Sequence, residues 1–180
     1  VGIHVRGRFG VNDVAEEILE VLRAAATRAD VVIVCGGLGP TSDDLTVDAA
    51  ATLVGVEPVI DAAHEDRLRA WFAQRGRTVS ALALRQVRVP DGAQVFPNPV
   101  GLAPGFSVRH QSADLYFLPG VPREMRAIFE SSILPSLRAR SLSVSSNTAD
   151  PDVSQEQPVR HKTILRIFGK SEGLTDEALR

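Results

Sequence analysis

The feature that most constrains the fold is a short apolar run followed directly by a glycine-rich turn. The run is Val31–Cys35, which is β-branched except at its last residue, as expected for a strand covered on both faces. Gly36, Gly37 and Gly39 follow, and because they lack a Cβ the chain can turn sharply and a ligand can approach the main chain. This order predicts an open α/β sheet, in which ligands bind beyond the carboxyl ends of the strands.

The turn leads into a polar stretch that suggests a site for phosphate and a metal ion. Thr41, Ser42, Asp43 and Asp44 precede a predicted helix, and the N-terminus of a helix favours an anion. Adjacent carboxylates repel phosphate unless a divalent cation lies between them, and magnesium commonly joins one or two carboxylates to substrate phosphates. The stretch lacks the lysine of a Walker loop and the third glycine of the dinucleotide fingerprint. The alternative is that one of the two aspartates only caps the helix.

Composition narrows the class of protein. The 180 residues suffice for one domain with a small appendage. A net charge of -2 gives no basic field for nucleic acid, which we therefore exclude as the main partner. The single cysteine, Cys35, excludes an internal disulfide and is expected to be a small core residue. We expect a cytoplasmic protein without a membrane partner, since no apolar run approaches membrane-spanning length.

The N-terminal part predicts a β-α-β unit. Alternation over residues 1–8 suggests a strand. Asn12 or Asp13 is expected to cap the following helix, with Glu16 as the partner in a capping box. Helical spacing predicts a buried face made of Val14, Ile18, Val21, Leu22 and Ala25. With the strand over 31–35, this arrangement predicts a parallel pair.

Two further helices are predicted from their caps. One covers residues 47–54 and ends at Gly55, and the other runs from the cap Asp61 to Gly76. His64 is expected to be a solvated surface residue rather than a metal ligand, because no second histidine follows at metal spacing. A short amphipathic helix is expected over 79–84. Two basic residues, Arg85 and Arg88, follow this helix. They could bind phosphate, or they could simply interact with the helix dipole at the C-terminal end.

A loop rich in proline and glycine is the second candidate for a binding wall. Residues 97–106 contain three prolines and two glycines, and prolines reduce the entropy lost when a loop is held in one shape. Turn chemistry alone is the alternative. A strand over 93–96 precedes the loop, and a hairpin of residues 106–109 and 115–118 follows it. Pro122 is expected in the first turn of the next helix, which Pro135 should end.

Taken as a whole, the sequence predicts three regions along the chain. Residues 1–140 form the main α/β domain and residues 141–160 a polar loop or linker. Residues 161–180 form a returning strand and the start of a C-terminal element.

Three motifs together resemble a known family. They are Gly-Gly-Leu-Gly-Pro-Thr-Ser-Asp-Asp-Leu-Thr at 36–46, Asn-Pro-Val-Gly-Leu-Ala-Pro-Gly-Phe at 98–106 and Leu-Pro-Gly-Val-Pro-Arg-Glu-Met at 118–125. In this order the chain resembles the N-terminal domain of the CinA (competence/damage-inducible protein A) family. That domain has a molybdopterin-binding-like fold, similar to the MogA and MoaB proteins.

The resemblance implies a fold, an activity and a cofactor. It implies a three-layer α/β/α sandwich with a mostly parallel sheet, of which the first strand and a Gly-Asp-Glu-Leu-Leu loop are missing here. It also implies self-association into a homo-oligomer and hydrolysis of the pyrophosphate in ADP-ribose with a divalent metal, magnesium or cobalt.

The resemblance also assigns roles to individual residues. The residues that would hold phosphate are Gly36, Gly37, Gly39 and Thr41. The metal ligands, which would also be catalytic together with Glu124, are Asp43 and Asp44. The opposite wall would be made of Asn98, Gly101, Ala103 and Pro104, and the site would be closed by Gly120, Pro122 and Glu124.

The chain departs from the family pattern at two polar positions. Ala83 stands where the family has an asparagine, and Leu102 stands where it has a threonine. The main hypothesis is a nucleotide pyrophosphatase. The alternatives are a molybdopterin- or nucleotide-binding domain without turnover, and a purely structural oligomerisation domain.

Overall fold

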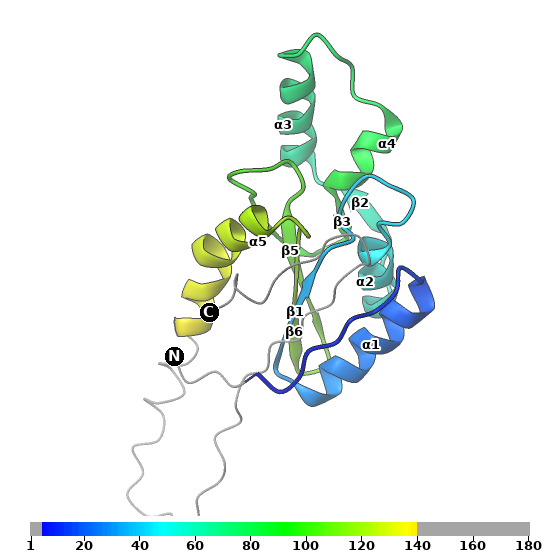
Figure 1. The fold of residues 1–180 in the computed structure, drawn as a ribbon, viewed down its shortest axis with the longest axis vertical. Coiled ribbons are helices and arrows are strands. Elements are labelled where there is room, and N and C mark those ends of the chain that lie inside the picture. The colour runs from blue at the N-terminus through cyan, green and yellow to red at the C-terminus, as the bar shows by residue number, and fades with distance from the viewer. Residues whose placement is uncertain (1–4, 140–180) are drawn as a thin grey trace, which may run out of the picture.

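The structure is a computed structural model that describes residues 5–139. Its helices are α1 (Ala15–Arg28), α2 (Thr46–Val54), α3 (Ala62–Ala73), α4 (Ala81–Leu84) with a 3-10 turn (Arg85–Val87), and α5 (Pro122–Ile128) with a π segment (Phe129–Ile133). Its strands are β1 (Val31–Cys35), β2 (Pro58–Ile60), β3 (Arg88–Pro90), β4 (Gln94–Phe96), β5 (Gly105–His110) and β6 (Ala113–Leu118). The elements are arranged as shown in Figure 1. The predicted regions 141–160 and 161–180 lie outside the described residues.

The α/β fold class is confirmed, and the main sheet is mixed. Its strand order is β1-β6-β5-β4, and β2 and β3 form a separate antiparallel pair. Within the described main sheet β1 and β6 run parallel, whereas β6–β5 and β5–β4 are antiparallel. The expectation of a mostly parallel sheet is therefore wrong for residues 5–139. The reason is the β5–β6 hairpin, since a two-residue connection such as 111–112 can join only antiparallel strands.

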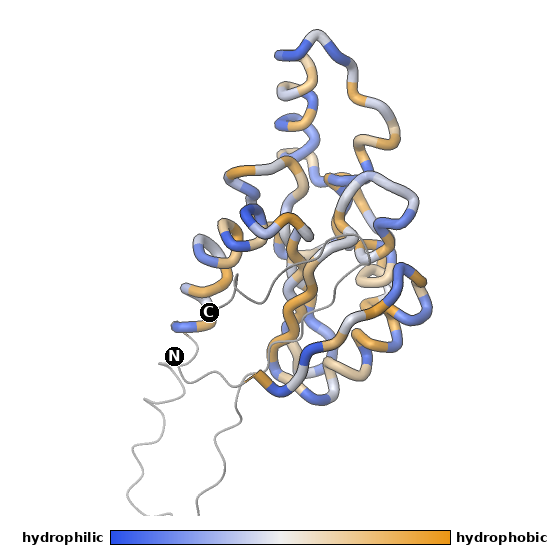
Figure 2. The backbone as a smooth tube through the Cα atoms, viewed as in Figure 1, coloured by the Kyte–Doolittle hydropathy of each residue, from blue (hydrophilic) through white to orange (hydrophobic). Residues whose placement is uncertain are grey.

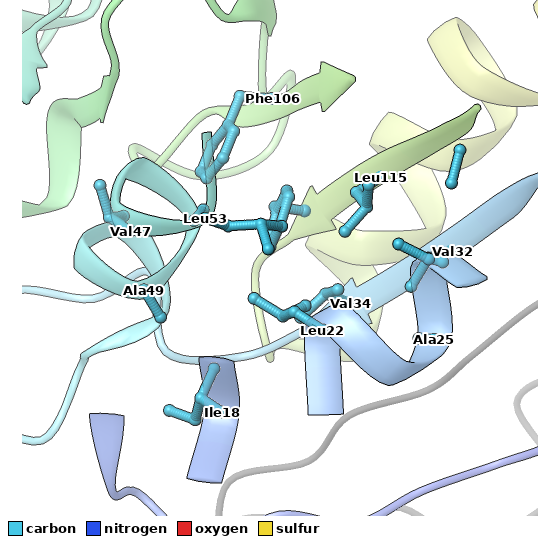
Figure 3. Packing of buried hydrophobic residues seen from close by; sticks show 14 of the residues in the cluster. Ile18, Leu22, Ala25, Val32, Val34, Val47, Ala49, Leu53, Phe106 and Leu115 are labelled. Carbon is cyan, nitrogen blue, oxygen red and sulfur yellow. The ribbon is translucent and has the colours of Figure 1, made fainter. Parts of the chain in front are cut away.

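Helices cover both faces of this sheet, so the predicted three layers are confirmed. Val32 and Val34 of β1 point towards α1 and α2, where they pack with Leu22 (Figure 3). The alternate residues of β1, including Ile33, belong to a second cluster with Ile128 of α5. Figure 1 shows α5 on the side of the sheet opposite to α1 and α2. Because both faces of β1 are covered, all five of its residues are buried, Cys35 included.

The predicted N-terminal β-α-β unit is tested only in part, because residues 1–4 lie outside the described residues. Residues 5–8 form no strand. Among the described residues the parallel partner of β1 is β6, which lies more than eighty residues further along the chain. Neither Asn12 nor Asp13 caps α1, because Val14 occupies the N-cap position without a side-chain hydrogen bond.

The other predicted features of α1 are partly confirmed. The Asn12 side chain donates to Glu17 Oε2 at 2.9 Å, so the expected capping box with Glu16 is replaced by this contact. Ile18, Leu22 and Ala25 are buried as predicted, while Val14 is 40% exposed.

The cap of α3 is confirmed, but the prediction for His64 is wrong. The Asp61 carboxylate accepts from the backbone N–H of His64 at 3.0 Å. The same oxygen lies 2.6 Å from Nδ1 of the imidazole. His64 is only 8% exposed, because this bond satisfies the ring and lets it pack inside the first turn.

Helix α5 begins at Pro122 as predicted but does not end near Pro135. After the π segment the chain is helical again over residues 134–139. Proline has no N–H to donate to the preceding turn, and its ring crowds the carbonyl four residues back. The helix accommodates Pro135 by widening one turn, in which Leu134 N donates to the oxygen of Phe129, five residues back.

Hydrophobic residues gather in the central strands, as Figure 2 shows along the backbone. Among the described residues no helix has the length and apolarity needed to cross a membrane.

Candidate functional site

A cavity of about 830 Å³ lies beyond the carboxyl ends of β1 and β6. The turn after β1, the loop after β4 and the junction between β6 and α5 surround it. The lining residues are Asp13, Cys35, Gly36, Gly37, Leu38, Gly39, Thr41, Asp43, Asp44, Trp71, Gln86, Val100, Gly101, Leu102, Ala103, Pro119, Gly120, Val121 and Glu124. Ligand pockets usually enclose about 300–1,000 Å³, so the cavity is large enough for a nucleotide or a pterin.

The glycine turn is built by close backbone approaches. The N–H of Gly36 donates to the oxygen of Leu118 at 2.9 Å, which anchors the turn to β6. Gly37 has a φ of 70°, and its carbonyl accepts from Thr46 N at 3.2 Å. A Cβ on Gly37 would overlap with the Thr46 side chain. Glycine is therefore required here both by the backbone conformation and by space.

Asp44 stabilises the turn that it belongs to. Its Oδ2 accepts from the backbone N–H of Thr41 at 2.8 Å and from the Thr41 hydroxyl at 2.5 Å. A Cβ on Gly39 would come within 2.6 Å of the same oxygen. Asp43 is exposed and accepts from Ser42 at 3.1 Å. Neither aspartate caps α2, whose N-cap is Leu45 without a side-chain hydrogen bond.

Asn98 fixes the proline-rich wall from behind. It is fully buried, and its Nδ2 donates to the Ala103 carbonyl at 2.8 Å and to Glu124 Oε2 at 2.7 Å. Its Oδ1 accepts from the N–H groups of Val100 and Gly101 at 3.1 and 2.8 Å. Asn98 therefore closes the loop on itself and ties it to the first turn of α5.

Most of the site residues predicted from the sequence line the cavity. Asp43, Asp44 and Glu124 line the same cavity as the other predicted residues Gly36, Gly37, Gly39, Thr41, Gly101, Ala103 and Gly120. Asn98, Pro104 and Pro122 do not line it. Asn98 and Pro104 are buried behind the wall, and Pro122 occupies the first position of α5, where its fixed φ starts the helix.

Sequence reasoning did not place Trp71, Gln86 or Asp13 in the site. Trp71 comes from α3. Gln86 follows α4, between the two arginines that could have met phosphate. Those arginines do not line the cavity; Arg85 and Arg88 lie 3.8 and 3.0 Å from Asp48 instead. The available signal was the residue type of Trp71, a large amphipathic ring of a kind that is common in binding sites.

The charged residues that line the cavity indicate which kind of metal ion it could bind. Its charged residues are all acidic: Asp13, Asp43, Asp44 and Glu124. Within residues 5–139 no group of three or more histidine, cysteine or carboxylate side chains is arranged to hold a metal. The arrangement therefore does not fit a closed structural zinc site. Two neighbouring carboxylates do fit magnesium, which usually takes one or two of them plus water and substrate phosphates.

Known proteins with similar sequences support the architecture. Residues 1–139 match the family described as "Probable molybdopterin binding domain". A CinA-like protein of Myxococcus xanthus is 40% identical over 179 residues, which is 99% of this chain and 40% of that protein. One from Shewanella sediminis is 40% identical over 134 residues, 74% of this chain and 32% of that protein. The chain thus spans less than half the length of these relatives.

A solved structure agrees with the sequence matches. The crystal structure of the protein CinA with unknown function from Thermoplasma acidophilum has a TM-score of 0.57 and 35% identity, and the match covers 66% of this chain and 69% of that one. The three motifs, the layered α/β fold and the match over residues 1–139 lead to one conclusion: the chain belongs to the molybdopterin-binding domain family and resembles the CinA-like proteins.

Proposed function

We propose that this domain hydrolyses the pyrophosphate linkage of a nucleotide such as ADP-ribose, with the help of a divalent cation. The observation that carries the proposal is that one cavity collects the glycine turn, Asp43, Asp44 and Glu124. These groups come from two separate stretches of the chain, and each suits one requirement of phosphoryl chemistry.

The glycine turn and the two aspartates would bind the charged part of the substrate. Backbone N–H groups of the turn would stabilise negative charge that develops on phosphoryl oxygens. Asp43 and Asp44 would hold magnesium or cobalt, and a bound cation polarises a phosphoryl oxygen and lowers the pKa of water. Asp44 has one oxygen committed to Thr41, so its other oxygen is the one we assign to the cation.

Glu124 would take a proton from the attacking water. Asn98 donates to its Oε2, which orients the carboxylate, and the glycine at position 101 gives it room, because a Cβ there would overlap with it. Water would add to one phosphorus and the bond to the bridging oxygen would break. The products from ADP-ribose are AMP and ribose 5-phosphate.

The decisive experiment measures AMP release from ADP-ribose with magnesium or cobalt. Asp44→Asn removes the charge but keeps an oxygen that can accept from Thr41, so the turn should stay folded. We expect activity to fall at least about 100-fold in Asp43→Asn and Asp44→Asn, as is typical when transition-state electrostatics are lost. Asp91→Asn, an exposed aspartate outside the cavity, is the matched control. Equal activity in all four proteins would refute the proposal.

A second candidate is a binding domain without turnover. The description of the matched family, a probable molybdopterin-binding domain, favours it. Calorimetry with ADP-ribose or molybdopterin that shows saturable binding, together with no product after prolonged incubation, would select this function. We also propose that the domain forms homo-oligomers, which sedimentation of the purified chain would test.

A further inference from the structure

Part of the cavity lining differs in chemistry from the glycine turn and the two aspartates. Trp71, Val100, Leu102 and Val121 are among the lining residues, and we call these four residues the apolar wall. Val100 and Val121 remain 40% and 43% exposed. Single exposed apolar residues are ordinary on protein surfaces, but here they border the same cavity as a tryptophan. The cavity therefore combines a polar part suited to phosphate with an apolar part.

Contacts between α3 and the proline-rich loop bring Trp71 to this wall. The Arg67 guanidinium donates to the backbone oxygen of Asn98. Trp71 lies four residues after Arg67 and hence on the same face of α3. The Asn98 side chain in turn accepts from Val100 N. These hydrogen bonds tie the face of α3 that carries Trp71 to the loop that carries Val100 and Leu102.

The indole of Trp71 is fixed on one face. The guanidinium carbon of Arg75 lies 3.7 Å from the ring centroid, and Arg75 also donates to the Trp71 carbonyl at 3.0 Å. Phe72 contacts the ring edge-on, with centroids 5.2 Å apart. Trp71 lines the cavity, whereas Arg75 does not. A ring held in this way can bind a flat ligand with little loss of side-chain entropy.

We propose that Trp71, with Val100 and Val121, binds the planar heterocycle of the ligand by stacking. The inference rests on the proposed function only in assigning the phosphate to the glycine turn. Aromatic side chains bind any base through its π-face, so the subsite accepts the shared chemistry of a purine and a pterin. Gln86 adds a polar contact: its Nε2 donates to Ala83 O at 3.0 Å, and its Oε1 can accept from the amino group that adenine and pterin both carry.

The chain contains a single tryptophan, so its fluorescence reports on Trp71 directly. The probes are AMP, ribose 5-phosphate and free pterin, each titrated into the purified chain with magnesium. We expect AMP to quench the fluorescence and ribose 5-phosphate, which has no base, to leave it unchanged. Competition between pterin and AMP in calorimetry shows whether both heterocycles use the subsite. Equal quenching by AMP and ribose 5-phosphate would overturn the inference.

Variants separate stacking from a merely structural role. We expect Trp71→Leu to weaken AMP binding about 10-fold, with ribose 5-phosphate affinity within about twofold of wild type, and Trp71→Phe to retain most of the affinity for AMP. Leu82→Ala, which changes an exposed apolar residue outside the cavity, is the control. An unchanged dissociation constant for AMP in a folded Trp71→Leu protein would overturn the inference.

The two proposals can fail separately. Hydrolysis that depends on Asp44 but not on Trp71 would refute the subsite and leave the proposed function intact. Binding of AMP that depends on Trp71, in a chain that releases no product from ADP-ribose, would refute the hydrolase and support the subsite.

Discussion

At the scale of single residues, Asn98 organises the site without reaching the cavity. It is fully buried, and both ends of its amide are hydrogen-bonded, to Val100, Gly101, Ala103 and Glu124. A buried polar group that is left unpaired costs roughly 1–3 kcal/mol, so these four bonds hold one loop conformation firmly. The position of the Glu124 carboxylate therefore depends on an asparagine that does not line the cavity.

A prediction at this scale concerns Gly101. A Cβ at this position would overlap with the Glu124 carboxyl group, so Gly101→Ala must displace either the loop or the carboxylate. We expect a fall of about 10-fold or more in AMP release, since a misplacement of about 1 Å in a catalytic group can cost about 100-fold. Gly10→Ala is the matched control, because a Cβ there meets no atom within 4 Å. Equal loss of activity in the two variants would contradict this reading.

Most of the residues that line the cavity could be predicted from the sequence, because their residue types and order are informative. Glycines allow a tight turn after an apolar strand and adjacent aspartates supply oxygen ligands, so residue type and order indicate where a cavity with polar groups can form. Trp71 and Gln86 could not be placed, because their contribution depends on how α3 and the 3-10 turn pack against the loop. Asn98 was taken for a lining residue, since the sequence cannot tell a ligand contact from a hydrogen bond that supports the wall.

At the scale of secondary-structure elements, α3 positions its side chains from a well-defined first turn. Burial raises the pKa of the Asp61 carboxyl, but the hydrogen bonds and the charge of His64 lower it by more, so the net pKa lies below its ordinary value of 3.8. The ionised carboxylate is thus favoured in the folded state. The same helix carries Arg67 and Trp71, so the cap influences the apolar wall.

The expected pH dependence of stability follows from the lowered pKa of Asp61. A group whose pKa is lowered on folding stabilises the protein above its unfolded pKa, and this stabilisation is lost as the pH falls through the folded pKa. Asp61→Asn should therefore be less stable than wild type at neutral pH, and the difference should shrink from about pH 4 downwards. Urea unfolding at several pH values measures it, with Asp66→Asn, an exposed aspartate on α3, as the control. A constant difference down to pH 2 would contradict the assignment.

Local patterns predicted the elements better than their pairing. The β5–β6 hairpin, the start of α5 and the C-terminal end of α2 at Gly55 were correct because turn residues and caps act within a few positions. The pairing of β1 with β6 was not predicted, because the two strands are distant in sequence and no local pattern indicates which distant strand will pair with β1.

At the scale of the whole molecule, the cavity joins both sides of the sandwich. The turn after β1 leads to α2 on one face of the sheet, while Glu124 belongs to α5 on the other. Any ligand that spans the cavity therefore links two layers that the hydrophobic core already holds together. Binding should be visible as a change in global stability rather than only as local ordering.

We predict that ADP-ribose with magnesium raises the melting temperature. At 100 times the dissociation constant a ligand adds about 2.7 kcal/mol, which corresponds to an increase of roughly 5–10 °C for a domain of this size. Differential scanning calorimetry measures the shift, and magnesium without ligand is the control. Chelation by EDTA should remove most of the shift. An equal shift with and without EDTA would show that binding does not need the cation.

The widened turn at Phe129–Ile133 has a consequence for how one helix can follow the sheet over its whole length. Ile128 and Ile133 are five positions apart, a spacing that would turn the second side chain away in a regular α-helix. Both are nevertheless fully buried, and so is Leu137 four residues later. The extra residue resets the phase of the helix, so that its two halves present one continuous apolar seam. Pro135, which would ordinarily interrupt a helix, is thereby compatible with continuous apolar packing of this helix against the sheet.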